Sequence, residues 1–329
     1  MTTRRAFLVA LGAGALAAPF PALAQQAPRR IGFLGARSRS TSSNPDVYVD
    51  AFVLGMRELG YVEGRNLVIE WRFADGKDER LPALAAELVR ANVELIVTHT
   101  TPGTQAAQRV TRTIPIVMAN ANDPIGSGFA ASLARPGGNI TGLSNVSVDL
   151  SPKYLELLRI MVPALSRVAV LVNPDNSTHQ PILKGIQTVA QRIGVKIMPV
   201  AAHAPEEIER GFARMSRDRA DAVIISSDSI FLTQARQIAG LAAKARLPTM
   251  FWSVLQVEAG GLMSYGQNYA ELYHRAATYV DKILKGARPG DLPIEQPTIF
   301  ELAINRKTAK ALRLAIPKEL LLRADRVIE

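Results

Sequence analysis

The sequence contains no cysteine, and aromatic residues make up only 6% of it. The absence of cysteine excludes disulfide bonds, thiolate metal ligands and a lipid-modified N-terminal cysteine. Four histidines are present, but their spacing suits no metal site. The G-x-S-x-G, P-loop, H-E-x-x-H and dinucleotide-binding glycine motifs are also missing. We therefore expect no metal, no cofactor and no enzymatic activity.

Long hydrophobic runs are equally scarce, and the clearest one stands at the N-terminus. Arg4 and Arg5 precede an apolar stretch over residues 6–18, and an A-L-A sequence ends at Ala24. These features are typical of a secretory signal peptide, and the order T-R-R-A-F-L resembles the twin-arginine class. A membrane anchor is the alternative, but the stretch is shorter than the ~20 residues that span a bilayer. We predict that residues 1–24 are removed after export, leaving a soluble periplasmic protein.

Basic residues outnumber acidic ones, and the formal charge is +10. Lys and Arg are scattered along the chain, and no dense basic run or basic, aromatic-rich strand accompanies them. This pattern favours a solvated basic surface, and we expect no nucleic-acid partner. An anionic membrane surface or an acidic ligand is the alternative explanation of the charge.

Short runs of Val, Ile and Leu, by contrast, are abundant and alternate with amphipathic segments. The first half has predicted strands at residues 30–35, 66–71, 94–98 and 115–119, and helices at 47–59, 81–89 and 104–111. The strand pattern repeats in the second half at residues 167–173, 195–200, 220–225 and 247–251. Such strands indicate parallel sheets covered on both faces. We therefore predict two similar doubly wound α/β domains, with a ligand site in the cleft between them.

The connections between the two halves predict the domain boundaries. We interpret residues 140–144 as the first crossing between the domains and residues 260–266 as the return crossing. A long helix over 269–285 leads to a proline-rich segment, a last strand over 300–304, a short helix and a polar tail. We predict an N-terminal domain of residues 29–144 plus 266–297 and a C-terminal domain of residues 145–265 plus 298–329.

Five segments resemble one known family. They are residues 121–128 (ANDPIGSG), 134–144 (ARPGGNITGLS), 151–158 (SPKYLELL), 260–266 (GGLMSYG) and 304–312 (INRKTAKAL). The chain is similar to ABC-transporter substrate-binding proteins whose better-known members bind tryptophan and other aromatic amino acids. This resemblance implies a type I periplasmic-binding-protein fold, in which two doubly wound parallel-sheet domains are joined by a hinge. It also implies a small-molecule ligand, an inner-membrane ABC permease with its ATPase as partners, and a monomer.

In the first half, candidate ligand residues follow two strands. Thr100, Thr101 and Thr104 open a helix, where hydroxyls and free N–H groups can hold a carboxylate. An ordinary helix N-cap is the alternative for these threonines. Asn120 and Asp123 follow the next strand, and Asp123 either receives a ligand ammonium group or caps the turn before a proline.

The second half offers a carboxylate at the corresponding place. Asp228 follows the strand over residues 220–225 and would bind the ammonium end of a zwitterion held at its other end by the Thr100–Thr101 loop. On this hypothesis Asp228→Ala weakens binding and leaves the melting temperature of the free protein nearly unchanged. The alternative is an N-cap for the helix that follows. Asn173 and Asn176 end the first strand of this half and should lie at the edge of the cleft.

The first loop departs from the family pattern. Its sequence R-S-R-S-T-S-S begins at Arg37 and Ser38, and the family's aromatic-amino-acid binders usually have a different loop here. Arg37 either recruits an acidic ligand or belongs to a solvated surface. Tyr265, near a predicted strand end, either contacts the ligand or belongs to the core.

These observations predict the periplasmic solute-binding component of an ABC importer, which closes its domains on an amino acid or a related carboxylate. A periplasmic sensor that presents its closed state to a receptor kinase would use the same fold and cleft. An exported α/β enzyme rests on fold analogy alone.

Overall fold

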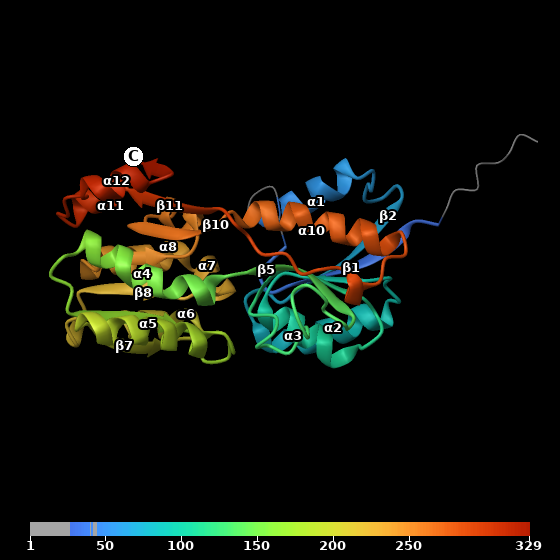
Figure 1. Ribbon diagram of the computed structural model, residues 1–329, viewed down its shortest axis with the longest axis horizontal. Coiled ribbons are helices and arrows are strands. Elements are labelled where there is room, and N and C mark those ends of the chain that lie inside the picture. The colour runs from blue at the N-terminus through green and yellow to red at the C-terminus, as the bar shows by residue number, and fades with distance from the viewer. Residues whose placement is uncertain (1–26, 40, 42–44) are drawn as a thin grey trace, which may run out of the picture.

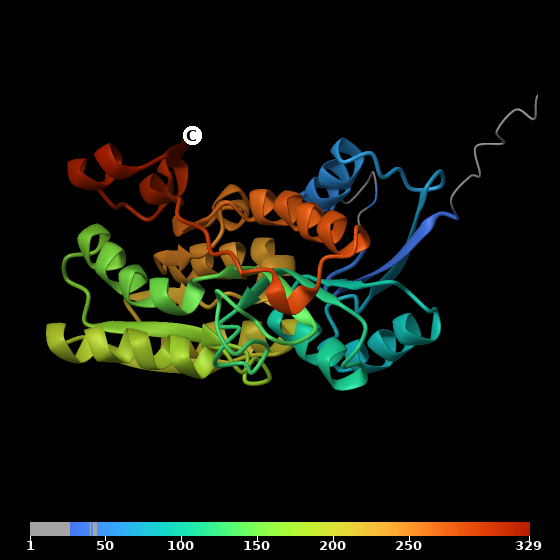
Figure 2. The same ribbon diagram turned by 45° about the vertical axis from the view of Figure 1, so that its right-hand side comes forward.

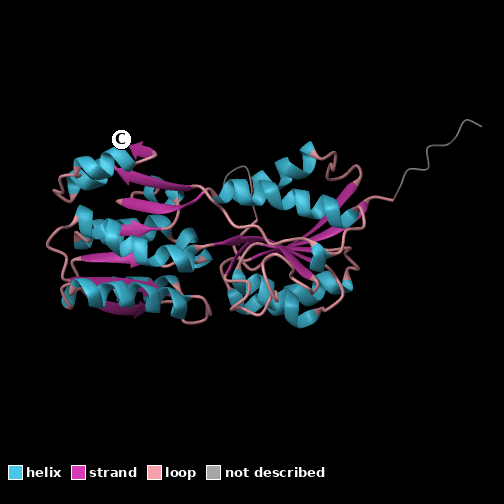
Figure 3. Cartoon of the chain, in the orientation of Figure 1, coloured by secondary structure: helices cyan, strands magenta, loops and turns pink. Residues whose placement is uncertain are grey.

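The computed structural model describes residues 27–39, 41 and 45–329. The predicted signal peptide therefore lies outside the described residues. Within them, no helix is both long and apolar enough to cross a membrane. The chain forms two α/β domains side by side along the longest axis of the molecule, each with its own sheet (Figures 1 and 3).

The first domain is built on a five-stranded parallel sheet, as the repeated apolar runs predict. Its strand order is β2-β1-β3-β4-β5, with β1 Arg29–Gly35, β2 Leu67–Phe73, β3 Ile96–Thr98, β4 Ile116–Asn122 and β5 Ile140–Asn145. Helices α1 (Val47–Glu58) and α10 (Tyr269–Leu284) cover one face, and α2 (Leu81–Arg90) and α3 (Thr101–Val110) cover the other (Figure 1). Alternate residues of β1 belong to different core clusters, Ile31 and Phe33 to one and Leu34 to the other. Burial on both faces explains why the strand is apolar throughout.

The second domain repeats this arrangement and extends it. Its sheet has the order β12-β11-β10-β9-β8-β6-β7, with β6 Arg167–Val172, β7 Lys196–Ala201, β8 Ala222–Ile225, β9 Thr249–Phe251, β10 Met263–Gln267, β11 Phe300–Asn305 and β12 Arg326–Ile328. The order β7-β6-β8-β9-β10 matches β2-β1-β3-β4-β5 of the first sheet, so the duplication seen in the sequence is a duplication of topology. Strand β11 is antiparallel to β10.

Helices cover both faces of the second sheet as well. Their bounds are α4 Ser147–Met161, α5 His179–Ile193, α6 Pro205–Arg217, α7 Ser229–Thr233, α8 Ala235–Ala245, α9 Val254–Glu258, α11 Arg306–Ala311 and α12 Lys318–Arg323. The first domain also contains single 3-10 turns at η1 (Asp78–Arg80) and η2 (Pro289–Asp291). Helices α4 and α5 pack together on one face, while α6 and α8 contribute to the core cluster of the other.

Three segments cross between the sheets: the one after β5, the one after β10 and the one between η2 and β11 (Figures 1 and 2). Gly142 on β5 has a φ of +126°, and a Cβ there would lie 2.2 Å from the Met118 carbonyl oxygen. Only glycine fits this close approach of β5 to β4 at the first crossing.

The observed elements differ from the expectations at three places. Strand β4 continues to Asn122, through a shift in register between Met118 and Ala121, so the predicted loop residue Asn120 lies within the strand. Helix α3 begins at Thr101, three residues earlier than expected. The segment expected as a polar tail contains α12 and the edge strand β12.

Candidate ligand-binding site

A small cavity lies between the two domains, outside the carboxyl ends of their strands. Its volume is about 30 Å³, which is room for about one water molecule. Both domains line it: Arg37, Tyr48, His99, Thr100, Thr101, Pro102, Asn120, Asn122 and Asn145 come from the first, and Asn176, Ser227, Asp228, Ser229 and Trp252 from the second.

Three of the lining side chains carry buried polar atoms that have no hydrogen-bond partner among the described residues. These atoms are Nδ1 of His99, Oδ1 of Asn122 and Nε1 of Trp252, and none of the three residues is more than 3% exposed. A buried polar group without a partner costs about 1–3 kcal/mol. The cavity wall therefore carries hydrogen-bonding capacity that the protein does not satisfy internally.

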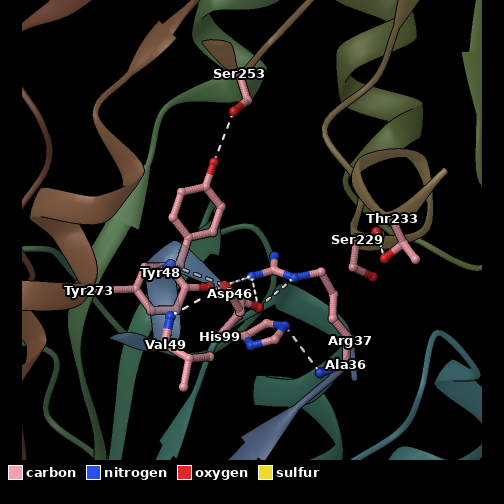
Figure 4. Close-up of polar contacts among 10 residues, drawn as sticks. All are labelled: Ala36, Arg37, Asp46, Tyr48, Val49, His99, Ser229, Thr233, Ser253 and Tyr273. Carbon is pink, nitrogen blue, oxygen red and sulfur yellow. Dashed lines mark hydrogen bonds and ion pairs between the residues drawn. The ribbon is translucent and has the colours of Figure 1, made fainter. Parts of the chain in front are cut away.

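The hydrogen bonding of His99 defines its charge and tautomer. Its Nε2 accepts a hydrogen bond from the backbone N–H of Ala36 at 3.1 Å (Figure 4), so the proton of the neutral ring is on Nδ1. Burial, and then the positive charge of Arg37, lowers the pKa of His99 to about 3. His99 is therefore a neutral donor at physiological pH.

Arg37 and Asp46 form a nearly buried ion pair beside His99 (Figure 4). Arg37 Nε donates to Asp46 Oδ2 at 2.9 Å and Nη2 donates to Oδ1 at 2.6 Å, while the guanidinium carbon lies 5.1 Å from the centre of the Tyr48 ring. Burial alone would lower the pKa of Arg37, but the charge of Asp46 holds it above its ordinary value. Burial likewise opposes ionisation of Asp46, and Arg37 keeps the pKa of that carboxyl below its ordinary value.

Asp46 has a second role as the N-cap of α1. Its Oδ1 accepts the backbone N–H groups of Tyr48 at 3.0 Å and Val49 at 3.3 Å. The same carboxylate thus starts the helix and fixes the position of the Arg37 guanidinium.

The Thr100–Thr101 loop lies at the N-terminus of α3, as predicted. Thr100 is the N-cap, and its Oγ1 accepts from the backbone N–H of Gly103 at 3.1 Å. Thr101 Oγ1 accepts from the backbone N–H of Asn122 at 2.9 Å. Each hydroxyl accepts a backbone hydrogen bond and keeps its own hydrogen to donate, next to the positive end of the helix dipole.

Asp228 is both a lining residue and a helix N-cap, so the two alternatives considered for it are not exclusive. Its carboxylate accepts from the Ile230 backbone N–H at 3.0 Å, Asn173 Nδ2 at 3.2 Å and Asn176 Nδ2 at 2.9 Å. Three buried donors thus depend on this side chain. The expectation that Asp228→Ala would spare the stability of the free protein is at odds with these contacts.

His179 packs beside Asp228, and both of its ring nitrogens are already in hydrogen bonds. Its Nδ1 accepts from the Asn173 backbone N–H at 2.7 Å, and its Nε2 lies 3.1 Å from the Ser227 carbonyl oxygen, to which it donates. Burial lowers the pKa of His179 despite the nearby charge of Asp228. Both ring nitrogens of this histidine are therefore satisfied by backbone groups.

Two larger cavities adjoin the central one and open along the line between the domains. One, of about 570 Å³, contains Arg37, Ser38 and Arg236. The other, of about 430 Å³, contains Asp78 and Asp175. Burial, followed by the negative charges of Asp228, Glu79 and Asp175, raises the pKa of Asp78 to about 7.

The structure brings most of the predicted site residues to this cleft. Arg37, Thr100, Thr101, Asn120, Asn176 and Asp228 line the central cavity, and Ser38 and Asn173 lie in the two adjoining ones.

Three predicted residues line none of these three cavities. Thr104 is fully buried and its hydroxyl bonds Thr98 Oγ1 at 2.7 Å. Asp123 accepts from the Gly126 backbone N–H at 2.8 Å and so caps the turn. Tyr265 packs near Phe300.

Eight lining residues were not among the predicted site residues: Tyr48, His99, Pro102, Asn122, Asn145, Ser227, Ser229 and Trp252. His99 lies directly after β3, and this place was a signal for the cleft. Asn145 ends β5 and Asn122 ends β4, so correct strand boundaries would have identified both. Trp252 directly follows the predicted strand at 247–251, which was the same kind of signal, whereas Tyr48 carried none.

The domains touch one another near the site. Tyr48 of α1 and Ser253, the N-cap of α9, share a hydrogen bond at 2.9 Å between their hydroxyls (Figure 4). The ring of Trp252 lies edge-on to Tyr269 with centroids 4.8 Å apart. In this arrangement the two faces of the cleft are in direct contact.

Comparisons with known proteins agree with this architecture. A protein from Clostridioides difficile (strain R20291), described as a tyrosine-binding protein, is 25% identical over 262 residues, which are 79% of this chain and 75% of that protein. The ABC domain from Streptococcus pneumonia in complex with L-Trp superposes with a TM-score of 0.84 at 24% identity, covering 92% of this chain and 100% of that one.

A third protein is similar in structure, and a family profile covers most of the chain. The ligand-free, open structure of a substrate-binding protein with adhesive properties from Clostridium difficile has the same 24% identity, covers 91% of this chain and 99% of that one, and has a TM-score of only 0.63. The sequence profile of ABC transporter substrate binding proteins matches residues 43–328, and the chain belongs to that family.

Proposed function

We propose that this protein captures a small amino acid between its two domains and delivers it to an ABC importer. The observation that carries the proposal is the set of buried, unpartnered polar atoms of His99, Asn122 and Trp252 in one interdomain cavity. Leaving such groups unpaired is unfavourable unless a ligand pairs them. The names of the relatives, a tyrosine-binding protein and a domain in complex with L-Trp, support an amino acid as the class of ligand.

The proposed binding mode places one end of a zwitterion on each domain. The α-carboxylate accepts hydrogen bonds from the hydroxyls of Thr100 and Thr101 at the N-terminus of α3. The ammonium group donates to the carboxylate of Asp228, which is buried and has one acceptor position beyond its three internal donors. Contacts to both domains exist together only when the domains meet, so the ligand stabilises the closed state.

Capture also requires opening. A cavity of about 30 Å³ cannot admit an amino acid while Tyr48 and Ser253 remain in contact, so the domains separate to load the ligand. We propose that export by the N-terminal segment brings the protein to the periplasm. There the loaded, monomeric form docks on an inner-membrane permease served by a cytosolic ATPase.

The first experiment is a thermal-shift screen of the twenty amino acids and small carboxylates, using protein purified without refolding. A ligand at one hundred times its dissociation constant stabilises the folded state by about 2.7 kcal/mol. At least one amino acid should raise the midpoint of unfolding, and Asn122→Ala should reduce that shift. A flat screen would refute amino-acid binding.

The second experiment tests the importer role by measuring uptake of that amino acid in cells with and without the gene. Deletion should abolish high-affinity uptake. Unchanged uptake with a lost transcriptional response would instead indicate a sensor.

A further inference from the structure

Arg37 presents an unused cationic edge to the interdomain cavity. Its Nε and Nη2 are bound to Asp46, while its Nη1 has no hydrogen-bond partner among the described residues and carries no dashed line in Figure 4. The Arg37 side chain is only 12% exposed, and it borders both the central cavity and the larger one beside it. Asp46 holds the guanidinium in place and leaves two N–H groups directed away from the ion pair.

The unpaired groups around the cavity are mostly donors. Nδ1–H of His99, Nε1–H of Trp252 and Nη1 of Arg37 can donate, whereas Oδ1 of Asn122 is the unpaired buried acceptor of the lining. The carboxylate in the cavity lining, Asp228, already accepts from three donors of its own domain. A ligand that satisfies this wall must therefore bring more acceptor oxygens than one α-carboxylate provides.

We propose that the ligand is an acidic amino acid, and that its second carboxylate binds Arg37 Nη1. This inference rests on the proposed function and narrows it to one class of amino acid. Hydrogen bonds between a guanidinium and a carboxylate are about twice as strong as neutral ones. The charges then balance across the site, with the ammonium on Asp228, the α-carboxylate at the start of α3 and the distal carboxylate on Arg37.

The same wall disfavours an aromatic side chain. Placing a ring against Arg37 and His99 would bury their free N–H groups without acceptors. A site built to hydrogen-bond a polar group rejects an analogue that lacks it by large factors. The apolar surface available for a ring is limited to Tyr48, Trp252 and Pro102, and the Tyr48 hydroxyl is already engaged by Ser253.

The test compares each acid with its amide by isothermal titration calorimetry: L-glutamate against L-glutamine, and L-aspartate against L-asparagine. The unmodified protein should bind at least one acid about 30-fold or more tightly than the matching amide. Arg37→Gln should remove this preference. Arg236→Gln removes the same charge from an exposed residue of the adjoining cavity and should preserve it.

The outcomes separate the two proposals. Equal or tighter binding of an amide or an aromatic amino acid to the unmodified protein overturns the inference and leaves amino-acid capture standing. Persistence of the acid preference in Arg37→Gln also overturns it. If no amino acid binds at all, the proposed function itself fails. The affinities of the acids and their amides are compared on the unmodified protein. This comparison therefore tests the preference for an acidic amino acid even if Arg37→Gln does not fold.

Discussion

The two buried histidines, His99 and His179, have similar positions but very different hydrogen bonding. Each connects the loop after the first strand of its sheet to the segment after the third strand. His179 does this with both ring nitrogens, through Asn173 and Ser227. His99 uses only Nε2, through Ala36, and its Nδ1 is left unpaired in the cavity wall.

The main charged groups of the two faces differ in the same way. In the second domain, the Asp228 carboxylate accepts three internal hydrogen bonds. In the first domain, Arg37 leaves Nη1 free beside the cavity. Asp228 and His179 of the second-domain face therefore stabilise the free protein, whereas His99 and Arg37 of the first-domain face keep hydrogen bonds available for a ligand.

The largest effect that tests this contrast is expected for Asp228→Ala. The substitution leaves two buried asparagine amides and a backbone N–H without their acceptor, and should lower the free energy of unfolding by about 3 kcal/mol. Urea denaturation of the free protein measures it. Asp228→Asn, which keeps an acceptor oxygen, is the control and should lose less. Unchanged stability of Asp228→Ala would mean that the hydrogen bonds to Asp228 do not stabilise the free protein.

The next effect concerns Asp78, the first-domain carboxyl that faces Asp228 and Asp175. Its pKa is raised from 3.8 to about 7, so the folded protein holds this proton more tightly than the unfolded chain. The resulting stability is complete below about pH 4 and is lost as the pH rises through about 7. The stability of Asp78→Asn relative to the unmodified protein should therefore rise by about 2.7 kcal/mol between pH 5 and pH 8, because the raised pKa of about 7 lies two pH units above the lower value.

Unfolding midpoints at the two pH values measure the effect of Asp78→Asn. Glu79→Gln removes a neighbouring exposed charge and serves as the control, because it should change the pH profile much less. Arg109 and His203 line the same cavity and are present in both variants. A pH profile of Asp78→Asn identical to that of the unmodified protein would contradict the assignment.

The paired substitutions His99→Ala and His179→Ala compare the two faces directly. Both side chains are at least 97% buried, so the loss of packing is similar. His179→Ala removes one more hydrogen bond and should be the less stable of the two by about 1 kcal/mol. Ligand affinity should follow the reverse order, with His99→Ala the weaker binder. Equal stabilities and equal affinities would remove the distinction between the faces.

The smallest change in stability is expected for Asn122→Ala. Its Oδ1 makes no hydrogen bond in the free protein, so truncation should alter the free energy of unfolding by less than about 1 kcal/mol. Affinity for the ligand should nevertheless fall about tenfold, because one hydrogen bond to the ligand is lost. Calorimetry and urea denaturation on the same sample give both numbers. Asn139→Ala, which removes a hydrogen bond to the Ile114 carbonyl on the periphery, should show the opposite pattern.

The sequence was sufficient to predict the two-domain α/β fold, because buried parallel strands are apolar along their whole length. It was also sufficient to place Thr100 and Asp228 at the carboxyl ends of corresponding strands, since the repeat aligns those ends. Asn122 was left out because the register shift in β4 extends that strand beyond its apolar run. No local pattern marks such a shift.

Tyr48 illustrates a different limit of sequence reasoning. It occupies the first turn of α1 and stacks on Tyr273 of α10, with ring centroids 5.4 Å apart. Its hydroxyl bonds Ser253 of the other domain. These partners are more than two hundred residues away in sequence, so only the assembled hinge region reveals that Tyr48 borders the cleft.

The position of Trp252 gives the protein an intrinsic optical reporter. The sequence has two tryptophans: Trp252 borders the cavity, and Trp71 lies on the outer strand β2 with its indole bound to Glu63. In a Trp71→Phe background, emission would arise from the cleft alone. A carboxylate accepting from the free indole N–H, or separation of Trp252 from Tyr269, would change the emission maximum. Stopped-flow fluorescence could then follow loading and closure in real time, without an attached dye.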